Sequence, residues 1–422
     1  MSRSKGAKPM ISKLIRSLVG SAAVIVLAAS GPSFAQAQTA PAEVKVGMLM
    51  SLTGLFARGG TNELYGSELA VKHINDSGGI KSMNGAKIKL VVIDVGDNVE
   101  RAKNAAQRMV AENPDMVAAS GAVISSFTLA ATEVTERVNL PLLTLSYSDQ
   151  ITNRGFKYVF QTSATGETQA RKAMPELMKL AEAAGVKPKT VGIIMDNTAA
   201  NYAFVKPMKE GGIFKDLGLQ IVMEEVFTPP LQDATSIVQK LRGARPDILL
   251  LLSIAVSDSR LLLEKINEFG LGQGRIPMIS NGSGITEPNI LDTMDKKLVQ
   301  GLMTVSANHG GKGQEKLAEE MKTLYKEPWV QQGPVSGYGT IMIIKEALEK
   351  AGKADREAVA KALREMDLTS GPANYFPGKR VKFDEAGRRV DAGLVIVQWQ
   401  DGTPVTVYPP ELASAKAFWP KN

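Results

Sequence analysis

Residues 44–52, VKVGMLMSL, begin the pattern that decides the fold class. An apolar run of this length is typical of a strand that is buried on both faces of a sheet. A helical segment follows at 62–79 (NELYGSELAVKHINDSGG), and a second apolar run follows at 87–95 (KIKLVVIDV). Parallel strands need a crossover connection, usually a helix. This stretch therefore predicts an α/β fold built on parallel sheets.

The same alternation continues to residue 121 and restarts at 190–196 (TVGIIMD). Further apolar runs follow at 218–227, 246–254, 275–280 and 301–307. Helical patterns at 316–326 and 338–352 precede a tail, 379–402, that is typical of hairpins. Because cores tend to divide beyond about 250–300 residues, we expect two lobes.

The first 37 residues have the layout of a secretory signal peptide. The apolar stretch 18–29 leads to small residues before Ala37, after which we place the cleavage. An uncleaved membrane anchor is the alternative, but about a dozen apolar residues fall short of the roughly 20 that cross a bilayer. Five basic residues and no acidic residue come first: Arg3, Lys5, Lys8, Lys13 and Arg16.

The charge balance gives no support to nucleic-acid binding. The whole chain has a net charge of +7, but without the five basic leader residues 45 lysines and arginines face 43 acidic residues, a net charge of +2. The chain has no cysteine, which fits an oxidising compartment and excludes thiolate chemistry. It also excludes a lipoprotein, because no cysteine follows the leader to be acylated.

No catalytic or metal-binding constellation is found in the sequence. His73 and His309 have no second ligand nearby, so we expect solvated or helix-surface roles for them. Neither a Walker loop nor a G-x-S-x-G elbow occurs, and Asp94 and Asp97 read as loop and cap residues. We therefore expect no enzyme activity, no cofactor and no metal.

Two serines follow the strand that ends at Gly121. Ser125 and Ser126 stand where a helix should begin, so a hydroxyl there is expected to cap the helix. The free N–H groups and the dipole of a first helical turn favour a carboxylate. Either the serines are caps and nothing more, or they belong to an anion site.

A second hydroxyl cluster ends the stretch 140–149, LPLLTLSYSD. Ser146, Tyr147, Ser148 and Asp149 follow an apolar run that reads as a strand. In open α/β sheets ligands bind outside the carboxyl ends of the strands. Both clusters could therefore converge on one ligand.

Four segments carry a resemblance to a known family: 44–60 with 65–80, GAVISSFTLAATEV, LPLLTLSYSDQITNRGFKYVFQT and YGTIMIIKEAL. They resemble the periplasmic leucine/isoleucine/valine-binding proteins, the solute receptors of branched-chain amino-acid ABC importers. The resemblance implies a type I periplasmic-binding fold with two doubly wound α/β lobes joined by three crossings. Lobe 1 would comprise 42–163 plus 305–377, and lobe 2 would comprise 164–304 plus 378–422.

The resemblance also implies roles for individual residues. Ser125 matches the serine that holds the ligand carboxylate. Ser146 and Ser148 match residues that bind the ligand head group. Tyr202 matches a tyrosine of the second lobe that closes over the ligand.

The chain departs from the family where the ligand ammonium should be bound. Asn281, with Gly282 and Ser283, stands in place of the expected acid. Gly59 and Gly333 stand where aromatic side chains are expected, which would widen the cleft. We therefore expect a hydrophobic or aromatic carboxylate that lacks an α-amino group.

Two alternatives about the ligand site remain open. Tyr147 and Phe127 could form apolar walls for the ligand or could equally be core packing. Glu287 or Asp149 could still reach an ammonium, which keeps an amino-acid ligand as the second reading.

The function implied is that of a receptor in the periplasm. It would be monomeric, bind its ligand between the lobes and deliver it to a membrane permease. A ligand sensor for a signalling partner would use the same fold and is the alternative of a different class.

Overall fold

The computed structural model describes residues 41–292 and 294–420, so the predicted signal peptide and its cleavage site lie outside the described residues. The first sheet has five parallel strands in the order β2-β1-β3-β4-β5. These strands are β1 (Glu43–Met50), β2 (Lys87–Asp94), β3 (Ala118–Gly121), β4 (Leu142–Thr144) and β5 (Val159–Gln161).

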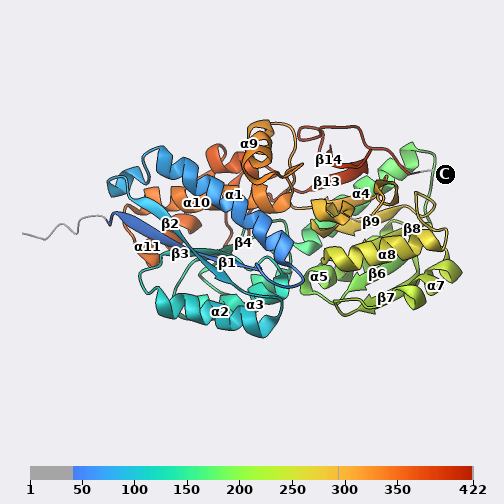
Figure 1. Cartoon of the computed structure of the whole chain (residues 1–422), viewed down its shortest axis with the longest axis horizontal. Coiled ribbons are helices and arrows are strands. Elements are labelled where there is room, and N and C mark those ends of the chain that lie inside the picture. The colour runs from blue at the N-terminus through green and yellow to red at the C-terminus, as the bar shows by residue number, and fades with distance from the viewer. Residues whose placement is uncertain (1–40, 293, 421–422) are drawn as a thin grey trace, which may run out of the picture. The chain divides into compact units, whose positions relative to one another are not determined.

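Helices cover both faces of this sheet because β1 is apolar on both sides. Val46 and Met48 pack into one core and Leu49 into the other. Figure 1 shows α1 and α10 on one face, with α2 and α3 on the opposite face. The covering helices are α1 (Ala57–Asp76), α10 (Gln332–Ala351) and α11 (Arg356–Arg364) on the first face, and α2 (Val99–Glu112) and α3 (Ser125–Arg137) on the second. Helix α9 (Glu315–Tyr325) packs beside α1, where Tyr325 stacks on Tyr65.

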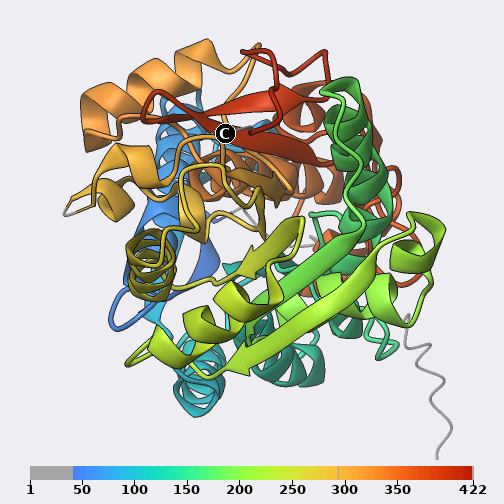
Figure 2. The same cartoon turned by 90° about the vertical axis from the view of Figure 1, so that its right-hand side faces the viewer.

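The second sheet has seven strands in the order β14-β13-β10-β9-β8-β6-β7. The antiparallel pair β13–β14, in red in Figure 2, agrees with the hairpins expected in the tail. The strands of the seven-stranded sheet are β6 (Thr190–Asp196), β7 (Gln220–Phe227), β8 (Ile248–Leu252), β9 (Met278–Asn281), β10 (Met303–Ser306), β13 (Val395–Gln400) and β14 (Thr403–Tyr408). A further antiparallel pair joins β11 (Asp367–Leu368) to β12 (Val381–Lys382).

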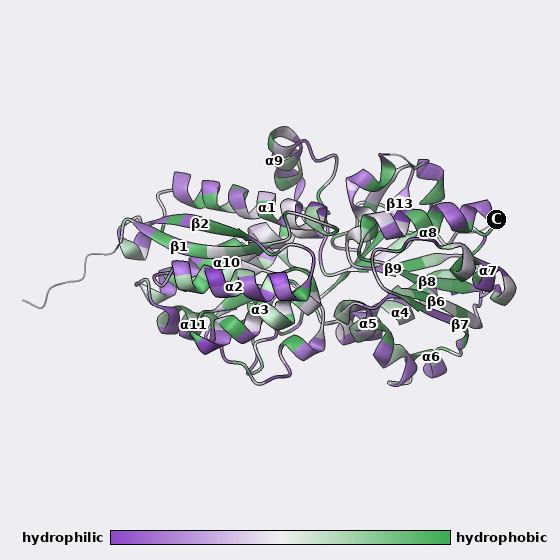
Figure 3. Ribbon diagram, turned by 60° about the horizontal axis from the view of Figure 1, so that its bottom comes forward, coloured by the Kyte–Doolittle hydropathy of each residue, from purple (hydrophilic) through white to green (hydrophobic). Residues whose placement is uncertain are grey.

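This sheet is also covered on both faces, and its central strands are apolar along their whole length. In Figure 3 β6 and β8 are largely hydrophobic, whereas the exposed side of α2 is hydrophilic. The helices of one face are α4 (Gly166–Ala183), α5 (Ala199–Lys209) and α6 (Ile213–Asp216), and those of the other are α7 (Thr235–Ala244) and α8 (Val256–Glu268).

Each sheet reverses its strand order once. In the first sheet the chain runs from β1 to β2 and then returns past β1 to β3, and in the second it runs from β6 to β7 and then returns past β6 to β8. At such a switch point the loops leave in opposite directions and open a crevice at the carboxyl ends of the strands. The loops after β1, β3, β6 and β8 are therefore where a site is expected.

The chain crosses between the sheets after β5, after β10 and before β13. Arg389 joins the first and third crossings: its guanidinium donates to the carbonyl oxygens of Thr162 (2.6 Å) and Pro377 (3.0 Å). Burial lowers the pKa of Arg389 to about 10. The packing of the two hydrophobic cores does not show at which residues the lobes hinge. The lobe ranges 42–163 plus 305–377 and 164–304 plus 378–422 therefore remain predictions.

Helices α1 and α10 lie unusually close because glycines face the neighbouring backbone. A Cβ on Gly66 would lie 2.1 Å from the carbonyl oxygen of Pro334, and a Cβ on Gly337 would lie 2.4 Å from that of Glu63. Both helices begin earlier than expected, at Ala57 instead of residue 62 and at Gln332 instead of residue 338. The first turn of α1 contains two glycines and that of α10 contains one glycine and a proline, so their helix propensity is weak, and packing between the helices overrides it.

Across residues 41–292 and 294–420, no helix combines the length and the hydropathy that a membrane crossing requires.

Gly66→Ala should destabilise the protein, because the added methyl group meets the α10 backbone rather than a movable side chain. We expect the free energy of unfolding to fall by about 1–3 kcal/mol, measured by urea denaturation. Gly243→Ala is the matched control: nothing lies within 4 Å of a Cβ there, and Gly243 is within helix α7. That control should be neutral or stabilising by up to about 1 kcal/mol. Equal effects of the two substitutions would contradict the packing argument.

Candidate functional site

A cavity of about 50 Å³ lies where the carboxyl ends of the two sheets meet, and we call it the inner cavity. Loops from both sheets and the first turn of α10 line it. One residue from each lining segment is Ser125, Tyr147, Asn201, Ile254, Asn281 and Gln332.

The loop after β3 makes a sharp turn before α3. Gly121 has a φ of +112°, and a Cβ on it would lie 2.2 Å from the carbonyl oxygen of Leu49, so only glycine fits. Ala122 follows with a φ of +50°. The turn lets α3 begin at Ser125, directly beside the inner cavity.

Ser125 does not cap α3, so the expected cap is wrong. The N-cap is Ile124, which makes no side-chain cap hydrogen bond. The hydroxyl oxygen of Ser125 instead accepts the backbone N–H groups of Tyr147 (3.1 Å) and Ser148 (3.2 Å). Because both bonds end on its oxygen, the hydroxyl keeps its own hydrogen available to donate.

Ser146 uses its hydroxyl within the protein. The oxygen lies 2.9 Å from the carbonyl oxygen of Ala122 and 2.8 Å from that of Val123. It also lies 2.6 Å from the hydroxyl of Thr128. Ser146 therefore ties the loop after β4 to the loop after β3, and a ligand would have to compete for its hydrogen bonds.

Tyr147 connects this loop to the crossings between the sheets. Its hydroxyl donates to the side chain of Gln332 and accepts the backbone N–H of Ala307 at 3.0 Å. Its carbonyl oxygen accepts the N–H of Gly166 at 2.8 Å. Burial raises the pKa of Tyr147, so the phenol stays neutral. Of the two alternatives left open by the sequence, Tyr147 lines the cavity, whereas Phe127 packs in the core against Phe56.

Asn281 lines the inner cavity at the end of β9. Its amide nitrogen donates to the side chain of Gln169 (2.8 Å) and to the carbonyl oxygen of Val305 (3.1 Å). Among the described residues nothing donates to its buried Oδ1. The position offers a neutral hydrogen-bond acceptor and no counter-charge.

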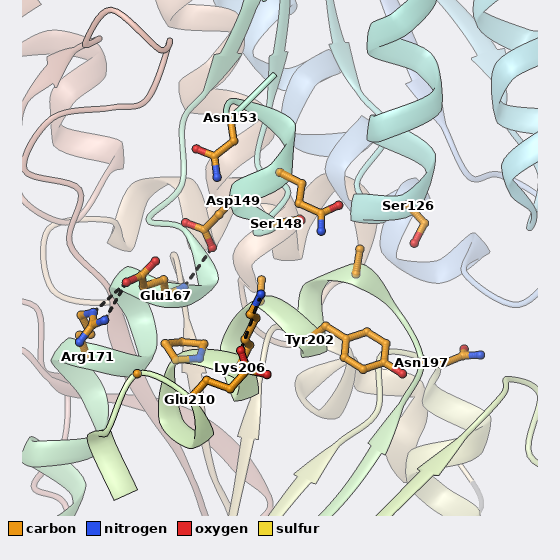
Figure 4. Close-up of a pocket in the computed structure, with 15 residues that line it drawn as sticks. Ser126, Ser148, Asp149, Asn153, Glu167, Arg171, Asn197, Tyr202, Lys206 and Glu210 are labelled. Atoms are coloured by element: carbon orange, nitrogen blue, oxygen red, sulfur yellow. Dashed lines mark hydrogen bonds and ion pairs between the residues drawn. The ribbon is translucent and has the colours of Figure 1, made fainter. Parts of the chain in front are cut away.

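The other three predicted site residues line a separate cavity of about 620 Å³, the outer cavity. In Figure 4 Ser126 and Ser148 lie on one side of it and Tyr202 on the other. Tyr202 is 48% exposed. The charged residues around this cavity are Asp149, Glu167, Arg171, Lys206 and Glu210. The structure thus divides the predicted site: Ser125, Ser146, Tyr147 and Asn281 meet at the inner cavity, and the other three do not reach it.

A third cavity, also about 50 Å³, adjoins the inner cavity, and we call it the side chamber. The two share the lining residues Val123, Ile124, Ile254, Ser283 and Gly284.

Glu287 and Gly59 line the side chamber. A Cβ on Gly59 would meet nothing closer than 3.9 Å, so this position does widen the cleft. Gly333 does not: a Cβ there would lie 3.1 Å from the backbone nitrogen of Glu63, so that glycine permits helix packing instead.

Two carboxyl groups are buried here, that of Glu63 in helix α1 and that of Glu287 in the wall of the side chamber. Burial raises the pKa of Glu63 and that of Glu287 to about 8. The guanidinium of Arg58 pairs with Glu327, its Nη2 lying 2.5 Å from Oε2, and its Nε remains 3.9 Å from Glu287. Both carboxyl groups therefore keep their protons near neutral pH.

Several residues of the site were not predicted from the sequence. Gln332 was missed because α10 was expected to begin six residues later, although Pro334 marks a first helical turn. Asp196 was also missed; its carboxylate accepts hydrogen bonds from the Asn201 side chain (2.7 Å) and the Ile254 backbone (2.8 Å) and so positions two lining segments. His309 was expected to be solvated but is buried, which lowers its pKa to about 4.

Comparison with known proteins identifies a family and several similar proteins. Residues 43–404 match the sequence profile of a family described as periplasmic binding protein. Leu/Ile/Val-binding protein homolog 7 of Brucella melitensis is 29% identical over 395 residues, which cover 92% of this chain and 96% of that protein.

Two solved structures show the same fold. A leucine-binding protein of Thermotoga maritima has a TM-score of 0.72 at 20% identity, covering 86% of this chain and 97% of that one. A solute-binding protein of R. palustris in complex with benzoate has a TM-score of 0.73 at 17% identity, covering 89% of this chain and 98% of that one. The α/β fold with two doubly wound lobes is thereby confirmed.

Tyr147→Phe should lower the free energy of unfolding by about 1–2 kcal/mol, because it removes the phenol oxygen that accepts the N–H of Ala307. Urea denaturation measures this change. Tyr202→Phe makes the same substitution at an exposed side chain and should stay within about 0.5 kcal/mol of the wild type. A Tyr147→Phe variant within about 0.5 kcal/mol of the wild type would contradict this role of the hydroxyl.

Stability should fall between about pH 5 and pH 8. Unfolded Glu63 releases its proton near 4.5, whereas folded Glu63 holds it to about 8, so raising the pH favours the unfolded chain. The slope is at most about 1.4 kcal/mol per pH unit for each such group. Glu63→Gln should flatten the slope but not abolish it, because Glu287 behaves in the same way. A variant whose pH dependence matches the wild type would contradict this assignment.

Proposed function

Because the chain belongs to the periplasmic binding protein family, we propose that it is the extracytoplasmic solute receptor of an ABC importer. Its ligand is a small hydrophobic or aromatic carboxylate, held in the inner cavity and delivered to a membrane permease. The family membership also confirms the resemblance to the Leu/Ile/Val-binding proteins found in the sequence.

One observation carries the carboxylate assignment: three helices begin in the wall of the inner cavity, and a fourth begins close to it. The helices α3, α5 and α10 place residues of their first turns in its wall, and α8 begins two residues after the lining Ile254. A helix N-terminus carries partial positive charge and free N–H groups, both of which favour an anion. The hydroxyl of Ser125, with its hydrogen available, adds a donor at the same place.

The rest of the wall favours an apolar ligand body. Val123, Ile124, Leu145 and Ile254 line the cavity together with the ring of Tyr147. Of its lining residues that the structure describes, none carries a charge. An ammonium buried there would lack a counter-charge, which costs on the order of several kcal/mol.

An amino acid or amide is the second candidate ligand. The free Oδ1 of Asn281 could accept a hydrogen bond from such a ligand, although it offers no charge. The relatives include both a leucine-binding protein and a protein in complex with benzoate, so they leave both classes open.

The proposed mechanism is ligand-dependent closure. A ligand that contacts loops of both sheets binds the closed arrangement more tightly and shifts the population toward it. Ser126, Ser148 and Tyr202 line the outer cavity and would contact a ligand only as it enters. The closed form is the one that docks on the permease.

The cellular setting follows from the leader. We propose secretion to the periplasm by the signal peptide, without a lipid anchor, and a monomeric receptor that has no enzyme activity. A sensor that reports the ligand to a signalling partner would use the same cleft.

A thermal-shift screen tests the ligand class. Benzoate and phenylacetate should raise the melting temperature, because their carboxylates match the helix N-termini and their rings match the apolar wall. Leucine and valine should not raise it. Stabilisation by leucine or valine, with none by either aryl acid, would refute the proposed class.

Ser125→Ala should weaken binding of the aryl acid by about 1–3 kcal/mol in a calorimetric titration, because it removes a donor to the carboxylate. Ser414→Ala is the matched control: its hydroxyl makes one long bond (3.4 Å) to Thr406 and does not line the inner cavity. Affinity unchanged in both variants would remove Ser125 from the site.

A further inference from the structure

We propose that the ligand carries a hydroxyl group at the end remote from its carboxylate, and that Glu287 in the side chamber recognises this hydroxyl. The inference rests on the proposed function, because it assumes that the carboxylate lies beside Ser125 in the inner cavity. It adds the chemical group that distinguishes the ligand from a plain hydrophobic acid.

The side chamber continues the inner cavity away from Ser125. The two share five lining residues, but Ser125 lines only the inner cavity and Glu287 lines only the side chamber. A ligand that is held at Ser125 and also contacts Glu287 therefore extends through both cavities, and we place the contacting group at its far end.

Glu287 turns one carboxyl oxygen toward the open space at Gly59. Its Oε2 accepts the side-chain N–H of Asn62 at 2.5 Å, and the side chain of Gln331 is a second hydrogen-bond partner of the carboxyl group. Its Oε1 is the atom nearest to a Cβ built on Gly59, at 3.9 Å. Because the residue is only 3% exposed and lines the chamber, a ligand can reach this oxygen only from the chamber.

The nearby cation forms only a long ion pair with Glu287. Arg58 gives both of its short contacts to Glu327, at 2.7 and 2.5 Å, and its Nε lies 3.9 Å from Glu287 Oε2. The Nε is buried, and no hydrogen-bond acceptor for it occurs among the described residues. Burial affects Glu287 more strongly than this pair does, so the pKa of Glu287 is raised.

A hydroxyl matches such a group better than a charge does. A protonated carboxyl donates one hydrogen bond and accepts others, and a hydroxyl can do the same in return. Burial raises the pKa of Glu287 to about 8, so the pair forms at neutral pH without burying a charge. Gly59 leaves the space that the hydroxyl needs.

Calorimetric titration with benzoate, 4-methylbenzoate, 3-hydroxybenzoate and 4-hydroxybenzoate tests the inference. At least one hydroxybenzoate should bind roughly tenfold more tightly than 4-methylbenzoate, which has similar size but no donor. Glu287→Leu should reduce this ratio to about one and leave the affinity for benzoate within about threefold, since benzoate has no group for the chamber.

Gly59→Val provides a second variant in case Glu287→Leu fails to fold. It fills the space in front of Glu287 and should also remove the preference, whereas Gly59→Ala, its matched control, should keep most of it.

The outcomes separate this inference from the proposed function. Equal binding of 4-methylbenzoate and both hydroxybenzoates, or a preference that survives in Glu287→Leu or Gly59→Val, would overturn the inference and leave the carboxylate site intact. Failure of all four acids to bind would overturn both.

Discussion

Two consecutive backbone N–H groups, those of Tyr147 and Ser148, converge on the hydroxyl oxygen of Ser125, and the arrangement of the site depends on this contact. It fixes the first turn of α3 against the loop after β4 and directs the hydroxyl hydrogen away from both. Through the Tyr147 phenol the same network reaches Ala307, where the chain has just left the second sheet. The proposed ligand site and the connection between the sheets therefore share one set of hydrogen bonds.

The sequence was informative wherever burial alone determines structure. The apolar runs that predict β1 and β6 are strands, because a strand covered on both faces needs apolar side chains along its whole length. The helix starts at Ala57 and Gln332 were missed, because glycines in those turns have poor propensity and serve contacts between helices. Helix propensity depends on residues that are close in the sequence, whereas those contacts join residues that are far apart in it.

The site was predictable in place but only partly in detail. The hydroxyl clusters after β3 and β4 do lie together at the carboxyl edge of the first sheet, because parallel strands end at a common edge. The sequence could not show that the hydroxyl of Ser146 would form hydrogen bonds within the protein. Nor could it show that Ser126 and Ser148 would line another cavity. The cluster of polar residues around Glu287 was harder still to predict, because its hydrogen bonds join residues 225 positions apart in one case and 269 in another.

Gly59 and Gly60 are neighbours in the chain with opposite tolerances. A side chain on Gly60 would strike the carbonyl oxygen of Ser51 at 2.1 Å, whereas one on Gly59 would enter open space. A substitution at Gly60 should therefore impair folding, whereas a substitution at Gly59 should first change which ligand the proposed site binds. If the side chamber binds ligand as proposed, a single codon change at position 59 would give a paralogue a different ligand while leaving the backbone packing of the fold in place.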